Sequence, residues 1–226
     1  DKLPMPVGRK YTLNFPVTKE TILEDVNFTK EQINRFDKAV EFIKNQGLNP
    51  GKLHTQASYG TINYTNCKYD YVRMGILMYG INASYDCYNK YNVDFKPVMA
   101  VKSKVTSIKY INPEETVSYG RTFKADNKIK IASVGIGYAD GVPRALSNIL
   151  IVKINNKKYH QIGRICMDQL MIEINDENPI AIGDEVILID TNESKDLTLE
   201  DWAKVTNTIT DEIICQFTTR LKRIEI

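Results

Sequence analysis

Two glycines enclose Tyr138 and Asp140 within VGIGYADGVPR, which covers residues 134–144. An apolar run precedes them, so the sequence predicts a strand that ends in a turn at the glycines. A tyrosine in such a turn can act as a base, although a free phenol loses its proton only near pH ~10. Catalysis would therefore need nearby positive charge or a hydrogen bond to the phenolate. Tyr138 is one of thirteen tyrosines, so a plain turn residue is the alternative.

Three other residues could carry chemistry, but each has a structural interpretation. Arg73 lies in the apolar run YDYVRMGILMYG (69–80), where a charge is costly unless it is paired. His54 stands in the short strand predicted for KLHTQAS (52–58), a position typical of a structural histidine. Cys166, in GRICMDQ, is consistent with a small core residue. Taken singly, none of these residues indicates a function.

The composition excludes several classes of protein. The chain has 226 residues and a net charge of +2, and its basic residues form no stripe, so we expect no nucleic-acid partner. The four cysteines are far apart and form no C-x-x-C pair, and the chain has two histidines, so we expect no metal site. These residues are Cys67, Cys87, Cys166, Cys215, His54 and His160. Neither a signal peptide nor an apolar run of 18 residues is present, which favours a cytoplasmic chain with reduced cysteines.

The elements that position these residues change in character along the chain. The segment 28–47 predicts a helix, with a T-x-x-Q capping box at Thr29 and Gln32 and a stop at Gly47. Its apolar face recurs at spacings of three and four: Ile33, Phe36, Val40 and Ile43. The apolar runs that follow indicate parallel strands buried on both faces, as in an α/β barrel.

From about residue 95 the pattern becomes a succession of short β-type stretches. Asn155–Asn156 and Gly183–Asp184 mark turns between them, and the spacing favours an antiparallel barrel or sandwich. Two short helices are expected in LTLEDWAKVTN and TDEIICQFTTR, before a final strand RLKRIEI. We therefore predict two domains, at residues 1–94 and 95–226.

Several motifs occur together in a fixed order, and they carry a resemblance to a known family. They are FTKEQINRFDKAVEFIKNQG, KLHTQASYG, YDYVRMGILMYG, YGRTF, GYADGVPRALSN, GRICMDQLMIEI, GDEVIL and WAKVTNTI. From residue 25 to 226 the chain resembles the C-terminal part of alanine racemases, and HTQASYG is most similar to the serine/alanine racemases linked to vancomycin resistance. The resemblance implies the remnant of an α/β barrel that binds pyridoxal phosphate, followed by a mainly antiparallel β-domain.

The resemblance also implies a racemisation that uses two bases. A lysine holds the cofactor covalently and acts on one face of the amino-acid substrate, and a tyrosine of the partner subunit acts on the other. We match that tyrosine to Tyr138, whose flanking glycines would let the loop approach a neighbouring site closely. A homodimer with shared active sites is expected.

The residues implied for cofactor binding fall in the first domain. Arg73 matches the arginine that faces the pyridine nitrogen, where its fixed charge keeps the ring a weaker electron sink. Ser58 matches the phosphate-binding serine, and Gly75 and Ile76 match positions whose backbone contacts the phosphate. His54 corresponds to a histidine that supports the cofactor.

Two residues of the β-domain are implied to bind the substrate. Met167 matches the residue whose backbone amide meets the substrate carboxylate. Thr219 stands in FTTRLKR where the family usually has a tyrosine, and Lys222 stands where proline is usual. The smaller threonine would leave room for a serine side chain.

The chain departs from the family at its beginning, because residues 1–24 contain neither the lysine motif nor the segment that normally precedes the helix. We therefore expect a part of a longer racemase, whose parent could be tethered to a membrane. By itself, the chain is expected to be inactive. The whole would supply D-alanine or D-serine for cell-wall precursors. The alternative is a non-catalytic dimerisation or regulatory domain derived from a racemase.

Overall fold

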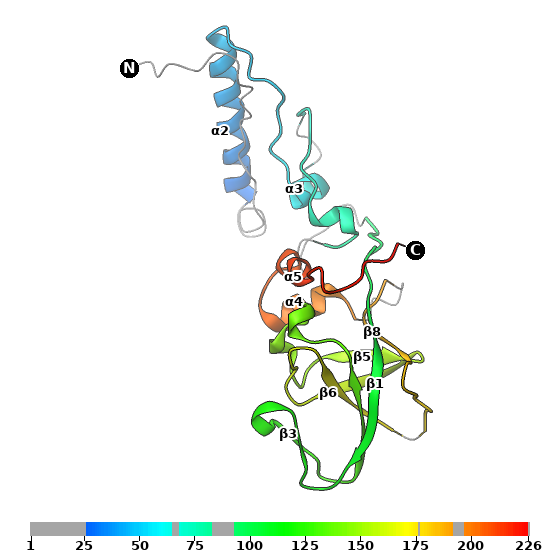
Figure 1. Ribbon diagram of the computed structural model, residues 1–226. Helices are drawn as coiled ribbons and strands as arrows, with labels where there is room; N and C mark the ends of the chain where they lie inside the picture. The colour runs from blue at the N-terminus through cyan, green and yellow to red at the C-terminus, as the bar shows by residue number, and fades with distance from the viewer. Residues whose placement is uncertain (1–25, 65–67, 83–92, 176, 192–196, 226) are drawn as a thin grey trace. The chain divides into compact units, whose positions relative to one another are not determined.

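The computed structural model describes residues 26–64, 68–82, 93–175, 177–191 and 197–225 (Figure 1). They belong to two compact units. The first unit contains the described residues up to Met78 together with 93–94, and the second contains 79–82 and the described residues from Phe95 onward. Cys67 and Cys87 lie outside the described residues.

The first unit begins with the long helix α2, Val26–Asn45. Phe36 and Val40 are buried on one face of α2, as the periodicity predicts. Gly47 ends the helix, because it adopts a φ of +71° and its amide donates to the carbonyl of Lys44 at 2.9 Å. The capping box is wrong, since α2 begins three residues before Thr29, which lies inside the helix.

Two extended segments of the first unit run side by side after α2. The amides of Asp70 and Arg73 donate to the carbonyls of Leu53 and Gln56, at 2.9 Å and 2.8 Å. Ala57 and Arg73 form a parallel bridge, the direction that an α/β barrel requires. The predicted strand at 52–58 is wrong, because this segment forms isolated bridges at His54 and Ala57 and the helix α3, Ser58–Asn63, begins directly after the second one. The 3₁₀ helix η1, Ile76–Tyr79, follows the second segment.

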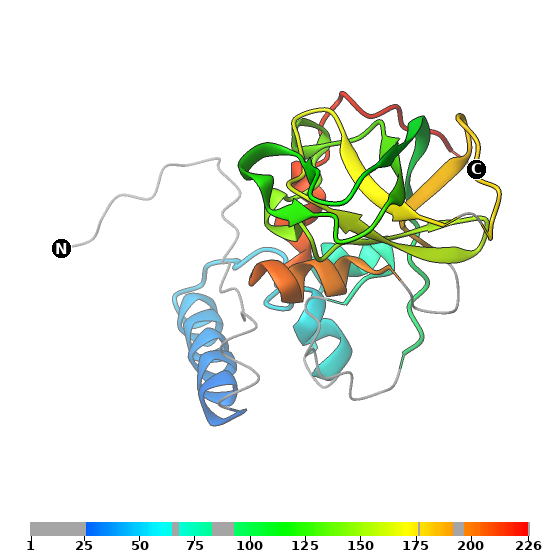
Figure 2. The same ribbon diagram turned by 90° about the horizontal axis from the view of Figure 1, so that it is seen from below.

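The second unit is built on a closed six-stranded barrel, so the barrel alternative is confirmed over the sandwich (Figure 2). Its strand order is β1-β4-β7-β6-β5-β8, and every pairing is antiparallel. The strands are β1 Val101–Ile111, β4 Ile129–Val134, β5 Ile151–Ile154, β6 Lys157–Ile162, β7 Leu170–Ile174 and β8 Glu185–Ile189. A small separate hairpin joins β2, Thr116–Val117, to β3, Phe123–Lys124.

Local turns and alternating apolar residues produce this barrel. Asn155 and Asn156 adopt positive φ values of 47° and 64°, which suit the two-residue hairpin between β5 and β6. The pairing of β1 with β8, which brings Val101 opposite Ile189, closes the barrel and removes the free sheet edges. The interior is aliphatic, and its fully buried side chains include Val134, Val152, Leu170, Ile172, Val186 and Leu188.

One ion pair is buried within the barrel domain. The ammonium of Lys153, on β5, lies 3.1 Å from a carboxylate oxygen of Asp190, directly after β8. Their side chains are only 7% and 13% exposed. Because two buried charges are tolerated only together, this pair ties β5 to the end of β8.

Two short helices complete the second unit, as the sequence predicts. They are α4, Leu199–Thr206, and α5, Thr210–Gln216. Helix α4 packs against α5 and against the 3₁₀ helix η4, Arg144–Leu146 (Figures 1 and 2). The predicted final strand is wrong, because residues 217–225 form turns and irregular structure.

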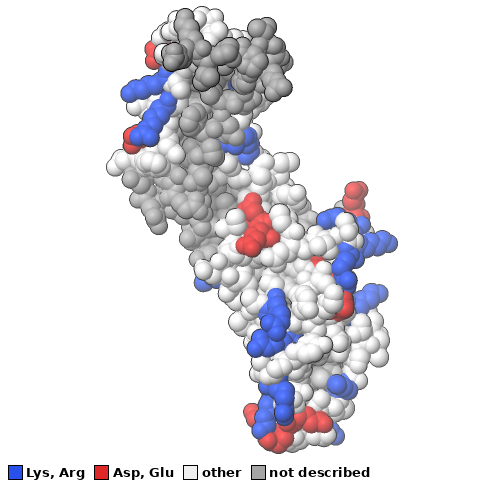
Figure 3. All heavy atoms as spheres, turned by 60° about the vertical axis from the view of Figure 1, so that its left-hand side comes forward, with Lys and Arg blue, Asp and Glu red and all other residues white. Residues whose placement is uncertain are grey.

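Acidic and basic side chains are interspersed on the face shown in Figure 3. No helix in the described ranges is both long and apolar enough to cross a membrane. Within the same residues, no group of three or more histidine, cysteine or acidic side chains is arranged to hold a metal ion.

Candidate active site

The first unit brings Ser58 and Gly75 into contact. The parallel bridge places Arg73 beside Ala57, so that the chain reaches Gly75 next to the first residue of α3. The amide of Gly75 then donates to the hydroxyl oxygen of Ser58 at 3.0 Å. Since that oxygen is the acceptor in this bond, the hydroxyl hydrogen of Ser58 can be donated to another group. Ile76 follows as the buried first residue of η1.

Polar atoms in the same region have unused hydrogen-bonding capacity. Arg73 donates through Nη2 to the carbonyl of Thr55 at 3.3 Å. Its Nε, His54 Nδ1 and the hydroxyl of Thr55 are buried and have no hydrogen-bond partner among the described residues. Buried polar atoms are nearly always paired, so these three atoms on adjacent segments carry hydrogen-bonding capacity that the described residues do not use. The predicted residues His54, Ser58, Arg73, Gly75 and Ile76 thus belong to one region of the first unit.

The carboxylate of Asp70 holds these segments together. It accepts a hydrogen bond of 2.8 Å from the amide of Leu53, and Lys52 lies 3.3 Å from its other oxygen. The amide of Leu53 and the ammonium of Lys52 lower the pKa of Asp70 below its usual range. Asp70 therefore carries a charge that supports the bridge beside His54 and Arg73.

In the second unit, the loop with Tyr138 lies directly against the loop with Met167. The amide of Tyr138 donates to the carbonyl of Cys166, and that of Ala139 donates to the carbonyl of Met167, both at 3.0 Å. At Gly137, a Cβ atom would lie 2.3 Å from the Cys166 carbonyl oxygen, so only glycine fits between the two backbones. Tyr138 and Met167 are 47% and 52% exposed, so both side chains are accessible.

The second glycine of the motif, Gly141, is required for a different reason. Gly141 adopts a φ of +111°, and a Cβ atom there would lie 2.7 Å from the carbonyl oxygen of Gln216. It therefore lets the loop turn back against the end of α5. The two glycines fix the backbone on both sides of the 3₁₀ helix η3, Tyr138–Asp140.

Arg220, which is not among the predicted site residues, connects these loops. Its Nε donates to Asp140 at 2.9 Å, and its Nη2 donates to the carboxylate of Asp168. Thr219 precedes it in an exposed turn. Segments that carry Tyr138, Met167 and Thr219 therefore meet at one end of the β-domain. Arg220 begins the segment predicted as a final strand, and that pattern does not indicate that its side chain binds two carboxylates.

A second tyrosine, Tyr119, also lies beside the Met167 segment and was missed as a candidate. It opens the 3₁₀ helix η2, Tyr119–Arg121, and is 73% exposed. Ser118 and Arg121 have positive φ values of 66° and 50°, which are uncommon outside glycine. The hydroxyl of Ser118 donates to the carbonyl of Arg164 at 2.6 Å and lies 3.1 Å from the sulfur of Cys166.

Such strain is concentrated at functional sites, which makes Tyr119 a candidate alongside Tyr138. Arg164 supplies positive charge close to this turn. Its Nε would lie 3.1 Å from a Cβ atom placed on Gly120, the residue that follows Tyr119. The motif YGRTF was the only signal in the sequence, and it does not reveal backbone dihedral angles.

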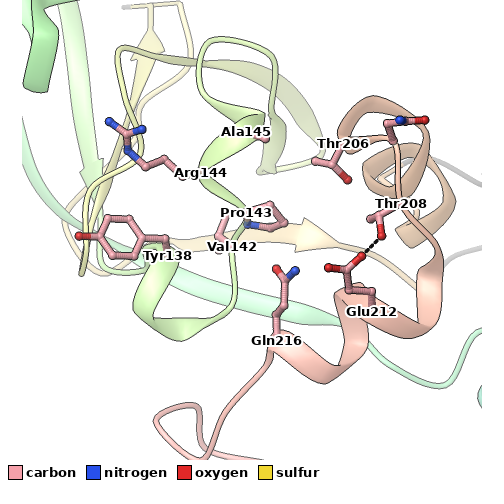
Figure 4. A pocket seen from close by; sticks show the side chains of 10 residues that line it. Tyr138, Val142, Pro143, Arg144, Ala145, Thr206, Thr208, Glu212 and Gln216 are labelled. Atoms are coloured by element: carbon pink, nitrogen blue, oxygen red, sulfur yellow. Dashed lines mark hydrogen bonds between the residues drawn. The ribbon is translucent and has the colours of Figure 1, made fainter.

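Tyr138 also borders a cavity of about 490 Å³ between its own loop and the ends of α4 and α5 (Figure 4). Arg144 lies on the same side as Tyr138, and Glu212 and Gln216 lie on the side of α5. Thr208 and Glu212 both line the cavity, and the carboxylate of Glu212 accepts a hydrogen bond from the hydroxyl of Thr208. The cavity lining is therefore mostly polar.

Comparison with known proteins shows which family the chain is similar to. The family model for the C-terminal domain of alanine racemase matches residues 98–225, and the model for its N-terminal domain matches residues 15–83. An alanine racemase of Nostoc is 38% identical over 202 residues, which are 89% of this chain and 52% of that protein. An amino-acid racemase of Enterococcus faecalis is 35% identical, over 88% of this chain and 27% of that protein.

Solved structures give the same result. Alanine racemase of Clostridium difficile in complex with cycloserine has a TM-score of 0.84 at 31% identity, covering 93% of this chain and 54% of that one. Alanine racemase of Bartonella henselae with covalently bound pyridoxal phosphate has a TM-score of 0.80 at 28% identity, covering 95% and 56%.

A closed β-barrel domain preceded in the sequence by part of an α/β unit is thus an arrangement that the chain shares with alanine racemases, one of which contains covalently bound pyridoxal phosphate. The chain belongs to the alanine racemase family. It spans about half the length of the curated relatives it matches.

Proposed function

We propose that this chain contributes part of the cofactor site and the β-domain of an amino-acid racemase that acts on alanine, serine or both. The observation that carries the proposal is the group of unpaired polar atoms around Arg73 and Ser58, in a chain whose family depends on pyridoxal phosphate. A phosphate and a pyridine ring need hydrogen-bond donors and a nearby fixed charge, and these residues supply both.

In this proposal, the hydroxyl of Ser58 and the backbone at Gly75 and Ile76 hold the phosphate. Arg73 faces the ring nitrogen, and its guanidinium keeps its own proton, so the ring stays a moderate electron sink. His54 lies among the residues that support the cofactor. When bound, pyridoxal phosphate makes the proton on the substrate Cα acidic enough to be removed.

A tyrosine of the β-domain is the proposed second base, which removes or returns that proton. Tyr138 is the tyrosine of the GYADG loop, and its backbone bond to Cys166 supports a fixed position. The strained backbone around Tyr119 and the charge of Arg164 favour Tyr119 as the alternative. The backbone of Met167 is proposed to bind the substrate carboxylate. The β-domain of one subunit would serve the active site of its partner in a homodimer.

The substrate preference is proposed to depend on Thr219. Thr219 is exposed in the turn before Arg220, and its side chain is smaller than the tyrosine that the family usually has there. We therefore propose that serine is accepted as well as alanine, as in the racemases linked to vancomycin resistance. In the complete enzyme, Thr219→Tyr should lower the rate with serine relative to alanine, and an unchanged ratio would reject this role.

The lysine that holds the cofactor is not among the motifs of these 226 residues. We propose that a longer cytoplasmic protein, or one tethered to a membrane, contains it and supplies D-amino acids for cell-wall precursors. The chain alone would then bind pyridoxal phosphate but not racemise. The competing function is a dimerisation or regulatory domain that no longer binds the cofactor.

Titration with pyridoxal phosphate separates the two functions. We expect the chain to give a saturable visible absorption band that borohydride does not fix covalently. Arg73→Leu and Ser58→Ala should weaken the binding at least tenfold, whereas Arg223→Gln in the second unit should not. An absence of saturable binding would favour the regulatory domain, and equal binding by all variants would contradict the assignment of Arg73 and Ser58 to the cofactor site.

A further inference from the structure

Arg220 joins three segments that are far apart in the sequence. Its Nε lies 2.9 Å from Oδ1 of Asp140, and its Nη2 donates to the carboxylate of Asp168. Guanidinium is planar, with donors in a fixed fork, so two carboxylates bound by one arginine are held at a defined separation. The two carboxylates also raise the pKa of the Arg220 guanidinium, which therefore stays charged.

Each charged residue of this network lies within two positions, in the sequence, of a residue that is proposed for the site. Asp140 follows Tyr138 by two positions, Asp168 follows Met167, and Arg220 follows Thr219. The network therefore spans the GYADG loop, the CMDQ loop and the turn after α5. These segments share no regular secondary structure; the backbone bonds from Tyr138 and Ala139 join the first two loops, and Arg220 adds a side-chain link that includes the turn after α5.

The carboxylate of Asp140 is the centre of the network. Its second oxygen, Oδ2, accepts a hydrogen bond of 2.9 Å from the amide of Gly137. The side chain is 10% exposed, whereas those of Arg220 and Asp168 are 49% and 61% exposed. A nearly buried carboxylate needs a partner charge, so a loss of Arg220 would disturb the loop from Gly137 onward rather than the surface alone.

We infer that Arg220 is a positioning residue, which sets the distance between the tyrosine loop and the loop that binds the substrate carboxylate. This role deepens the proposed function and rests on it. Arg220 contacts Asp140 and Asp168 rather than the reacting atoms, so it acts through them. A lysine keeps the charge but has a single ammonium, which cannot reproduce the two directed bonds of the fork.

Amide hydrogen exchange of the chain itself tests this inference without cofactor. In Arg220→Gln we expect the amides of Tyr138 and Ala139 to exchange at least tenfold faster than in the unaltered chain. The amides of β4 and β7 should keep their rates, and the midpoint of thermal unfolding should stay within a few degrees. In Arg220→Lys, the exchange rates of the Tyr138 and Ala139 amides should fall between those of the unaltered chain and those of Arg220→Gln.

The matched control is Arg223→Gln, three residues further on, where Nη2 donates only to the carbonyl of Phe217 at 3.4 Å. It should leave the exchange of Tyr138 and Ala139 unchanged. Equal exchange of these amides in Arg220→Gln and in the control would overturn the inference, and so would a uniform increase across β4 and β7.

If Arg220→Gln does not fold, Asp168→Asn decides, because it removes only the exposed arm of the network. It should speed the exchange of Ala139 at least threefold, and no change would count against Arg220. These outcomes are independent of racemisation, since a chain that fails to bind pyridoxal phosphate would still report them. In the complete enzyme, Arg220→Lys should lower kcat/KM at least tenfold, and Arg223→Gln should not.

Discussion

A methyl group at Gly137 should separate the two loops of the β-domain. In Gly137→Ala, the new Cβ atom would lie 2.3 Å from the Cys166 carbonyl oxygen and 2.4 Å from that of Met167. Both neighbours are backbone atoms, so neither can rotate away. The backbones must move apart by about 1 Å to reach a normal contact, since van der Waals separations are roughly 3.5 Å.

The expected loss of stability follows from these contacts. Overpacking costs about 1–3 kcal/mol, and each of the two hydrogen bonds from Tyr138 and Ala139 contributes about 1 kcal/mol. The φ of Gly137 is −151°, an ordinary extended value, so alanine brings no backbone strain there. Alanine also reduces the conformational freedom of the unfolded chain, which offsets about 0.4–1 kcal/mol of the lost stability. The net loss is about 2–4.5 kcal/mol, or a fall of about 4–18 °C in Tm for a chain of this size.

Thermal unfolding, followed by circular dichroism and by the fluorescence of the single tryptophan, Trp202, measures this loss. Gly135→Ala is the matched control, because its Cβ atom would meet side-chain atoms rather than backbone: the methyl of Thr106 at 3.0 Å and the hydroxyl of Ser103 at 4.0 Å. The control should change the stability by less than about 1 kcal/mol. If Gly137→Ala unfolds at the same temperature as Gly135→Ala, the close approach of the two loops is refuted.

Two further predictions concern charges in the two units. Lys153→Met removes the ammonium that pairs with the buried carboxylate of Asp190 and should cost about 3–5 kcal/mol in urea unfolding, whereas Lys102→Met at the barrel surface should cost under about 1 kcal/mol; equal losses would contradict the buried pair. The pKa of Asp70 is lowered in the folded chain, so its stabilising effect is complete above about pH 4 and is lost as the pH falls through the folded value. The stability difference between the unaltered chain and Asp70→Asn, measured by circular dichroism, should therefore shrink from pH 6 to pH 3, and a constant difference would disprove the role of this carboxylate.

Local signals in the sequence predicted the elements whose cause is local. The apolar face of α2, its end at Gly47 and the hairpin at Asn155–Asn156 each depend on residues within a few positions of one another. The closure of the barrel depends on the pairing of β1 with β8, about 85 residues apart, and alternation along the strands does not determine which strands pair.

The errors have equally physical causes. The alternation in RLKRIEI is typical of a strand, but Arg220 in this segment binds Asp140 and Asp168 instead. Tyr119 was passed over because strain is a property of dihedral angles, which the residue types around it do not reveal. The contact between Ser58 and Gly75 became visible only when the parallel bridge placed them side by side. The roles of these site residues stay predictions.

The most direct test of the proposed function is racemisation by the longer protein that contains this chain. Chiral chromatography should detect D-alanine or D-serine formed from the L-amino acid in the presence of pyridoxal phosphate. Replacing the tyrosine that acts as the base, Tyr138→Phe or Tyr119→Phe, should lower kcat by about 10²–10⁴-fold, and the other replacement should have a smaller effect. An absence of racemisation, or wild-type rates in both variants, would contradict a catalytic role for the β-domain.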